Sequence, residues 1–161
     1  MRLKRMVLGL GLLLAACSPH SADGAASTAS ASPSTHPVSG LPIVPLTVTH
    51  AGKAIVFRVE VAATSQSQAH GLMFRTEMGP DEGMVFPMTP PRDASFWMKN
   101  TVIPLDIIFI GIDGRISNIA ANAQPYSQEQ ILSSGQVKGV LELNGGRAEQ
   151  LGIVAGDKVA W

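Results

Sequence analysis

The sequence predicts a mainly β protein, a compact antiparallel barrel or sandwich with two short helices. Two observations support this fold class. From residue 43 onward, the chain consists of short apolar or alternating segments that glycine and proline separate. Only two segments carry helical signals, and both are too short to supply the crossovers of a doubly wound parallel sheet.

The first two segments predict a β-hairpin. Residues 46–49 alternate leucine or valine with threonine, and residues 55–61 place apolar side chains at every second position. Residues 50–53, His-Ala-Gly-Lys, have the composition of a turn. Such alternation is typical of strands with one buried face.

Two short helices are predicted from their capping residues. Ser65 and Gln68 have the spacing of a capping box, which predicts a short helix over residues 67–72 that starts near Thr64. Asn144 is expected to cap a second helix over residues 145–151. Neither helix is long enough to organise the fold alone.

The other strands are expected as short runs between turns. A turn at residues 111–114, Gly-Ile-Asp-Gly, joins two of them. A domain of roughly 120 residues is long enough to bury one core. The expected runs lie at residues 84–86, 95–98, 105–110, 115–120, 137–143 and 158–161.

The composition narrows the classes of function. Twelve Lys and Arg balance twelve Asp and Glu, and no basic run lies outside the extreme N-terminus. Nucleic acid is therefore not an expected partner, because neutralising phosphates needs a clustered basic surface. The single cysteine excludes an intramolecular disulfide and a zinc site of several thiolates. No cofactor is expected.

The N-terminus predicts export as a lipoprotein. Basic residues precede an apolar run at residues 6–16, which is too short to span a bilayer core of about 30 Å but suits a signal peptide. The run ends in Leu14-Ala15-Ala16-Cys17, which resembles the bacterial lipobox. Residues 1–16 are thus expected to be removed, and Cys17 to receive lipid. The alternative is an ordinary secretory signal with a coincidental cysteine.

Lipid on Cys17 would hold the mature chain on a membrane, because each buried lipid methylene contributes roughly 0.8 kcal/mol. Ser18 follows the cysteine. In Gram-negative lipoproteins, which this sequence resembles, a residue other than Asp at that place usually means transfer to the outer membrane. The expected location is the outer membrane, facing the periplasm.

Residues 17–42 are expected to form a flexible tether. They consist mainly of Ser, Ala, Thr, Gly, Pro and His, which cannot bury enough apolar surface to offset the entropy of ordering. Two histidines here, His20 and His36, are interpreted as solvated. The folded domain is then expected over residues 43–161.

Several motifs in this domain resemble those of the domain of unknown function 192 family. They occur in the same order with similar gaps, and the resemblance covers nearly all of residues 46–161. It implies a compact, β-rich single domain, often exported, and implies no catalytic residues, because none is established for the family. The motifs are Gly71-Leu72-Met73-Phe74-Arg75, Glu82-Gly83-Met84-Val85-Phe86, Phe96-Trp97-Met98-Lys99-Asn100-Thr101, Ile103-Pro104-Leu105-Asp106, Asp113-Gly114-Arg115-Ile116 and Val140-Leu141-Glu142-Leu143.

A polar cluster is the first candidate site. Strand alternation in residues 105–110 places Asp106 on one face with two isoleucines. An unpaired buried carboxylate costs several kcal/mol, so Lys99, Asn100 or Arg75 is expected to partner it. In one interpretation the pair is structural. In the other, Arg75 and Lys99 line a pocket for a small anionic or hydroxyl-rich ligand, or a cell-wall component, and Asp106 accepts its hydrogen bonds.

Trp97 extends this candidate ligand site. It is flanked by Phe96 and preceded by a proline-rich loop at residues 87–92. Aromatic side chains beside such loops can stack on sugar rings or on peptide prolines. The alternative is a half-buried structural tryptophan. The expected ligand-binding residues are Arg75, Trp97, Lys99, Asn100 and Asp106.

An enzyme is the alternative function. Asp106 or Glu142 would act as general acid/base in a hydrolase-like reaction, and Lys99 would stabilise negative charge. However, the sequence has no nucleophile motif, no phosphate loop and no His-Glu-x-x-His. Glu142 shares its strand face with Val140 and Asn144, so it is equally expected to point to water.

Methionine suggests a further alternative, a Cu(I)-handling protein. Met73, Met84 and Met98 lie in one methionine-rich stretch with His70, and thioethers with an imidazole are soft ligands that favour Cu(I). The competing interpretation is that these methionines fill the core, because all three fall inside apolar motifs. No metal is therefore assigned.

Overall fold

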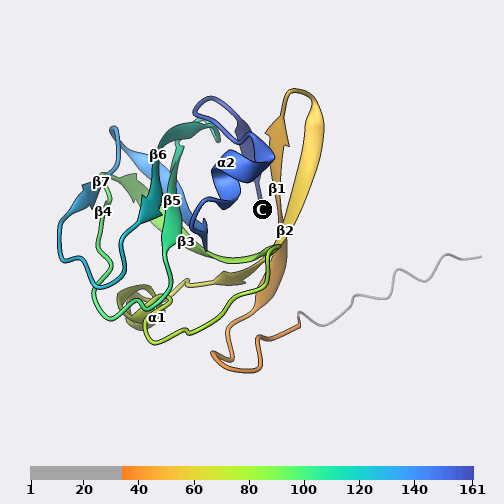
Figure 1. Ribbon diagram of the computed structural model, residues 1–161. Helices are drawn as coiled ribbons and strands as arrows, with labels where there is room; N and C mark the ends of the chain where they lie inside the picture. The colour runs from red at the N-terminus through yellow and green to blue at the C-terminus, as the bar shows by residue number, and fades with distance from the viewer. Residues whose placement is uncertain (1–33) are drawn as a thin grey trace, which may run out of the picture. The chain divides into compact units, whose positions relative to one another are not determined.

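The computed structural model describes residues 34–161, and this part of the chain is mainly β with two short helices, as predicted (Figure 1). The helices are α1 (Ser65–His70) and α2 (Arg147–Leu151). The strands are β1 (Ile43–His50), β2 (Lys53–Val61), β3 (Glu82–Arg92), β4 (Ser95–Phe96), β5 (Leu105–Gly111), β6 (Ile116–Ala123), β7 (Ile131–Leu132), β8 (Val137–Asn144) and β9 (Lys158–Ala160).

Seven strands form one sheet in the order β6-β5-β8-β3-β2-β1-β9, and β4 pairs with β7 in a separate ribbon. The pairs are antiparallel, as predicted, with one exception. Strands β2 and β3 run parallel, from Arg58 opposite Glu82 to Val61 opposite Val85. A parallel pair needs a crossover of about a dozen residues or more, and the segment that contains α1 supplies it.

The sheet curls but does not close into a barrel. Its edge strands, β6 and β9, meet only near one isolated bridge between Arg115 and Lys158. There the amide of Val159 donates to the carbonyl of Gly114 at 2.8 Å. The architecture is therefore sandwich-like, and α2 lies between the β1–β2 hairpin and the β5–β6 pair (Figure 1).

The domain buries two apolar clusters, one on each face of the central strands. The first contains Phe57, Ile108 and Ala148 of α2, and the second contains Phe86 and Phe109. Strand β5 contributes to both clusters, because its successive side chains alternate between the two faces. This explains why its central residues are uniformly buried rather than alternately exposed.

Helix α1 begins at Thr64, as predicted, but Thr64 and Ser67 form its capping box in place of Ser65 and Gln68. The amide of Ser67 donates to Thr64 Oγ1 at 3.1 Å, and the amide of Thr64 donates to Ser67 Oγ at 3.0 Å. Ser67 thus takes the capping-box position that was expected for Gln68. The helix covers Ser65–His70 instead of residues 67–72.

The start of α2 also differs from the prediction. Asn144 does not cap it, since its side-chain amide donates to the carbonyls of Met78 and Gly79 at 3.0 and 2.9 Å. The N-cap is Gly146, at a φ of 81°, and no side chain within the helix start caps it. A carboxylate from the neighbouring strand β5, Asp106, supplies the cap instead.

Residues 34–42, called the N-terminal segment below, lie against the domain. The amide of Ile43 donates to the carbonyl of Ser34 at 2.7 Å, and that of Val61 to the carbonyl of Pro42 at 2.9 Å. This part of the expected tether thus makes backbone hydrogen bonds to the start of β1 and the end of β2. Cys17, the expected signal peptide and residues 18–33 lie outside the described residues. Within residues 34–161, no helix has the length and hydropathy needed to cross a membrane.

Candidate functional site

Asp106 is fully buried, and backbone amides satisfy its carboxylate. Oδ1 accepts from the amides of Asn122 and Gly146 at 2.7 and 2.9 Å, and Oδ2 accepts from the amide of Ala148 at 2.7 Å. This corrects the expectation that a cationic or amide side chain would partner it. The peptide groups at the start of α2 are positively polarised, so they stabilise a carboxylate in place of Lys or Arg.

Lys99 and Asn100 lie in the loop that leads to β5 and make other contacts. Lys99 Nζ lies 5.4 Å from the centroid of the Trp97 ring, which is a cation–π distance. Asn100 Nδ2 points to Met73 Sδ at 3.9 Å. These two side chains and Asp106 therefore do not form the predicted cluster.

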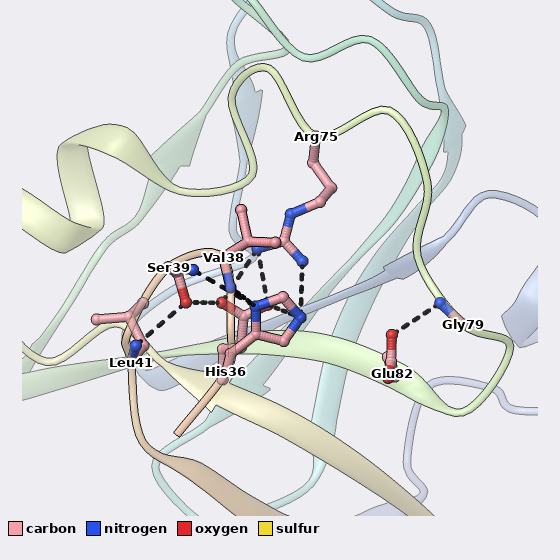
Figure 2. Close-up of polar contacts among 8 residues, drawn as sticks. His36, Val38, Ser39, Leu41, Arg75, Gly79 and Glu82 are labelled. Carbon is pink, nitrogen blue, oxygen red and sulfur yellow. Dashed lines mark hydrogen bonds and ion pairs between the residues drawn. The ribbon is translucent and has the colours of Figure 1, made fainter. Parts of the chain in front are cut away.

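Arg75 belongs to a different polar cluster, in which its partner is Glu60 of β2. Arg75 Nη2 lies 2.9 Å from Glu60 Oε1. Arg75 Nη1 lies 3.3 Å from His36 Nε2, as Figure 2 shows. Ser39 Oγ donates to the same glutamate. His36, expected to be solvated, is thus held by the domain, because the N-terminal segment closes over a buried ion pair.

A cavity of about 1000 Å³ adjoins this cluster. Its walls are the N-terminal segment, α1, residues 71–79 and Glu82. Glu82 accepts a hydrogen bond from the amide of Gly79 at 2.9 Å (Figure 2). The guanidinium of Arg75 is already committed to Glu60, so this cavity does not present the anion site that the sequence suggested.

A second cavity, of about 290 Å³, lies between α1, the end of β3 and β4. Its lining includes Phe86, Met88 and Phe96, and Trp97 reaches it from the following loop. The rings of Phe86 and Phe96 meet edge to face, with centroids 5.1 Å apart. One ionisable side chain from the central sheet, Glu142 of β8, also lines it.

Glu142 is only 5% exposed, and it does not point to bulk water. In the sheet it lies between Met84 of β3 and Ile107 of β5. Among residues 34–161, its carboxylate forms no ion pair, and burial is the one cause of its pKa shift, with no hydrogen bond or charge contributing. Burial therefore raises the pKa of Glu142 to about 8, because the charged form loses hydration without compensation.

Three other polar side chains that line this cavity have partners among the described residues. Gln68 Nε2 donates to the carbonyl of Pro87 at 2.8 Å, and its Oε1 accepts from Arg92 Nη2 at 3.3 Å. Thr101 Oγ1 faces the carbonyl of Lys99 at 3.4 Å. Glu142 is thus the polar group on which an entering molecule can act most strongly.

The proposed copper ligands are divided between cavity and core. His70 and Met73 line both cavities, whereas Met84 and Met98 are fully buried in the second apolar cluster. In the part of the chain that the structure describes, no group of three or more His, Cys, Asp or Glu side chains is arranged to hold a metal ion. The four candidates are not gathered around one cavity.

These features define a class: a small, sandwich-like β domain with a cavity that ends on a buried carboxyl group. The family model described as DUF192, an uncharacterized ACR, matches residues 46–161. The chain belongs to this family. No curated protein matches it.

Two solved structures are similar to this chain. A protein of unknown function from Novosphingobium aromaticivorans DSM 12444 is 59% identical, with a TM-score of 0.79 over 82% of this chain and 94% of that one. A proposed transcription regulator from Sinorhizobium meliloti 1021 is 39% identical, with a TM-score of 0.73 over 74% of this chain and 94% of that one. The fold is thus shared with two solved structures at 39% and 59% identity.

Proposed function

We propose that this chain is a small-ligand-binding module and that the ligand enters the 290 Å³ cavity to contact Glu142. One observation carries the proposal: a carboxyl group that is 5% exposed faces a cavity and has no partner among residues 34–161. Such a group destabilises the free domain, because its desolvation is not offset. A ligand that supplies a hydrogen-bond donor would remove this penalty.

The cavity favours a ligand with one polar end and an apolar body. Its volume is near the lower limit of small-molecule sites, which span roughly 300–1000 Å³. Leu72, Phe86 and Phe96 provide apolar walls, while Trp97, 49% exposed, stands near the solvent. A carboxyl group at the inner end disfavours an anion. Of the ligands expected from the sequence, the hydroxyl-bearing class is therefore kept and the anionic class is dropped.

The proposed location is the outer membrane, facing the periplasm, with lipid on Cys17. This rests on the apolar run at residues 6–16 and the lipobox-like residues that end it. The ligand would then be a small periplasmic or cell-wall compound. Nucleic acid is not a proposed partner, although one relative is called a transcription regulator, because this chain carries equal numbers of basic and acidic residues.

Acid/base catalysis in the same cavity is a second candidate function. A carboxyl group with a pKa of about 8 holds its proton at neutral pH and can act as a general acid. Asp106 is not proposed for this role, since both its oxygens accept backbone hydrogen bonds. Turnover of a bound ligand that Glu142→Gln abolishes, without loss of binding, would favour the enzyme.

The binding proposal is tested by thermal denaturation of the full chain with small alcohols and amines that carry an apolar body. Members of these classes should raise the melting temperature of the wild type and of a control, Glu77→Gln, whose side chain lines the other cavity. Glu142→Gln should lose most of the shift. The proposal is wrong if no compound shifts the wild type, or if the shift is unchanged in Glu142→Gln.

A further inference from the structure

We propose that the cavity is a cation site and that its ligand is a primary ammonium group on a small apolar body. The inference rests on the proposed function and specifies the chemical class of the ligand. An ammonium group offers three donors and a full positive charge. Glu142 is the buried, unpartnered acceptor that such a group would meet at the inner end of the cavity.

The walls of the cavity suit a cation as well as an apolar body. Three aromatic side chains, Phe86, Phe96 and the half-exposed Trp97, line the same cavity as Glu142. Aromatic ring faces attract cations within about 6 Å of the ring centroid. Lys99 already demonstrates this at the mouth, since its Nζ lies 5.4 Å from the centroid of the Trp97 ring.

Three cations of the described chain, one of which lines the cavity, have other partners. Arg92 donates to Gln68 Oε1, Lys99 lies over Trp97, and Arg75 pairs with Glu60. None of these three forms an ion pair with Glu142. A buried carboxylate requires either several hydrogen-bond donors, as Asp106 has, or a positive partner. Among residues 34–161, Glu142 has neither, and an ammonium group would supply both.

A cation is favoured over a neutral hydroxyl because the hydrogen bond to it is charge-assisted. Such bonds are shorter and roughly twice as strong as those between neutral groups. A cation also favours the ionised form of Glu142, which burial suppresses. An alcohol would leave the carboxyl group protonated and would form only neutral hydrogen bonds.

The two ligand classes differ in their pH dependence. With a pKa of about 8, Glu142 is roughly one-tenth ionised at pH 7 and roughly nine-tenths ionised at pH 9. Ammonium binding needs the ionised form and should tighten about tenfold over this range, whereas alcohol binding should weaken. The other charged or titratable groups that line the cavity are His70, Arg92 and Asp93, so these must be controlled.

Isothermal titration calorimetry of the full chain with 2-phenylethylamine and 2-phenylethanol tests the inference. Titrations at pH 7 and pH 9, each in two buffers of different ionisation enthalpy, give both the affinity and the number of protons released. At pH 7 the amine should release close to one proton per molecule bound. Glu142→Gln should abolish this release and the tightening with pH, whereas His70→Gln, Asp93→Asn and Glu77→Gln should keep both.

The calorimetric outcomes distinguish the cation site from the broader proposed function. Tighter binding of the amine, with proton release that depends on Glu142, supports the cation site. Tighter binding of the alcohol, weakening with pH, overturns the cation site but leaves the proposed function intact. Binding of neither compound, or binding that Glu142→Gln does not change, overturns the cation site. If other small alcohols and amines also fail to shift the melting temperature, the proposed function fails as well.

Discussion

Replacing Asp106 by asparagine tests whether this buried carboxylate holds the fold together or serves a ligand. Its two oxygens accept three backbone hydrogen bonds, at 2.7, 2.9 and 2.7 Å. Asparagine has almost the same shape but only one acceptor oxygen. If that oxygen replaces Oδ1, the side-chain NH₂ faces the amide of Ala148, and two donors oppose each other.

The magnitude follows from these three contacts. Hydrogen bonds to a charged group each contribute about 1.5–3 kcal/mol, and neutral ones about 0.5–1.5 kcal/mol. The substitution weakens two bonds from charged to neutral and removes the third. The expected loss in the free energy of unfolding is therefore about 4 kcal/mol. For a domain of this size, that lowers the melting temperature by roughly 10–20 °C.

Urea denaturation of the wild type and Asp106→Asn measures this loss. The matched control is Asp113→Asn in the exposed turn between β5 and β6, where one oxygen accepts from the amide of Arg115 at 3.0 Å. The control should change stability by no more than about 0.5 kcal/mol. A loss below about 1 kcal/mol for Asp106→Asn would refute the structural role. So would a selective loss of ligand affinity in a variant that remains folded.

Three further predictions concern other parts of the domain. Burial raises the pKa of Glu142 from its ordinary value of 4.5 to about 8 in the folded state. The free energy of unfolding of the wild type should therefore fall as pH rises from about 5 to 8. Urea titrations should show a smaller fall for Glu142→Gln. Arg75→Met removes the ion pair between Arg75 and Glu60, whose side chain is 4% exposed, and should lower the free energy of unfolding by about 3–5 kcal/mol. The double variant Arg75→Met/Glu60→Met should recover part of this loss. If the double variant loses as much stability as Arg75→Met and Glu60→Met lose together, the pairing is contradicted. Phe74 is 65% exposed and has a φ of 63°, so Phe74→Gly should leave stability unchanged or raise it by up to about 1 kcal/mol in thermal denaturation. A marked loss of stability would mean that the Phe74 ring makes stabilising contacts despite its exposure.

Local sequence patterns predict most of this fold, and the errors have a common origin. The hairpin of β1 and β2 follows from alternation and one turn, which are properties of neighbouring residues. The cap of α2 could not be predicted this way, because Asp106 reaches it from another strand. The parallel pairing of β2 with β3 likewise depends on how the α1 segment packs, which no local pattern encodes.

The candidate site is harder to predict than the fold, for the same reason. Alternation correctly places Glu142 on one face with Val140, but it does not reveal whether that face is buried. Met84 and Ile107, which flank Glu142 on the adjacent strands, decide this, and they are distant in sequence. The pairing of Arg75 with Glu60 escapes prediction because it depends on the parallel β2–β3 pair.

A comparison of the two buried carboxyl groups gives the strongest argument for the cavity. They lie almost side by side, since Asp106 of β5 is opposite Leu143 of β8 and Glu142 is opposite Ile107. Being one residue out of phase, they face opposite sides of the sheet. On one side, the start of α2 and the amide of Asn122 supply three donors. On the other side, where α1 and β4 leave a cavity, the described chain supplies none. The carboxylate of Asp106 thus has its hydrogen-bond donors within the domain, whereas Glu142 would receive one from a molecule that enters the cavity.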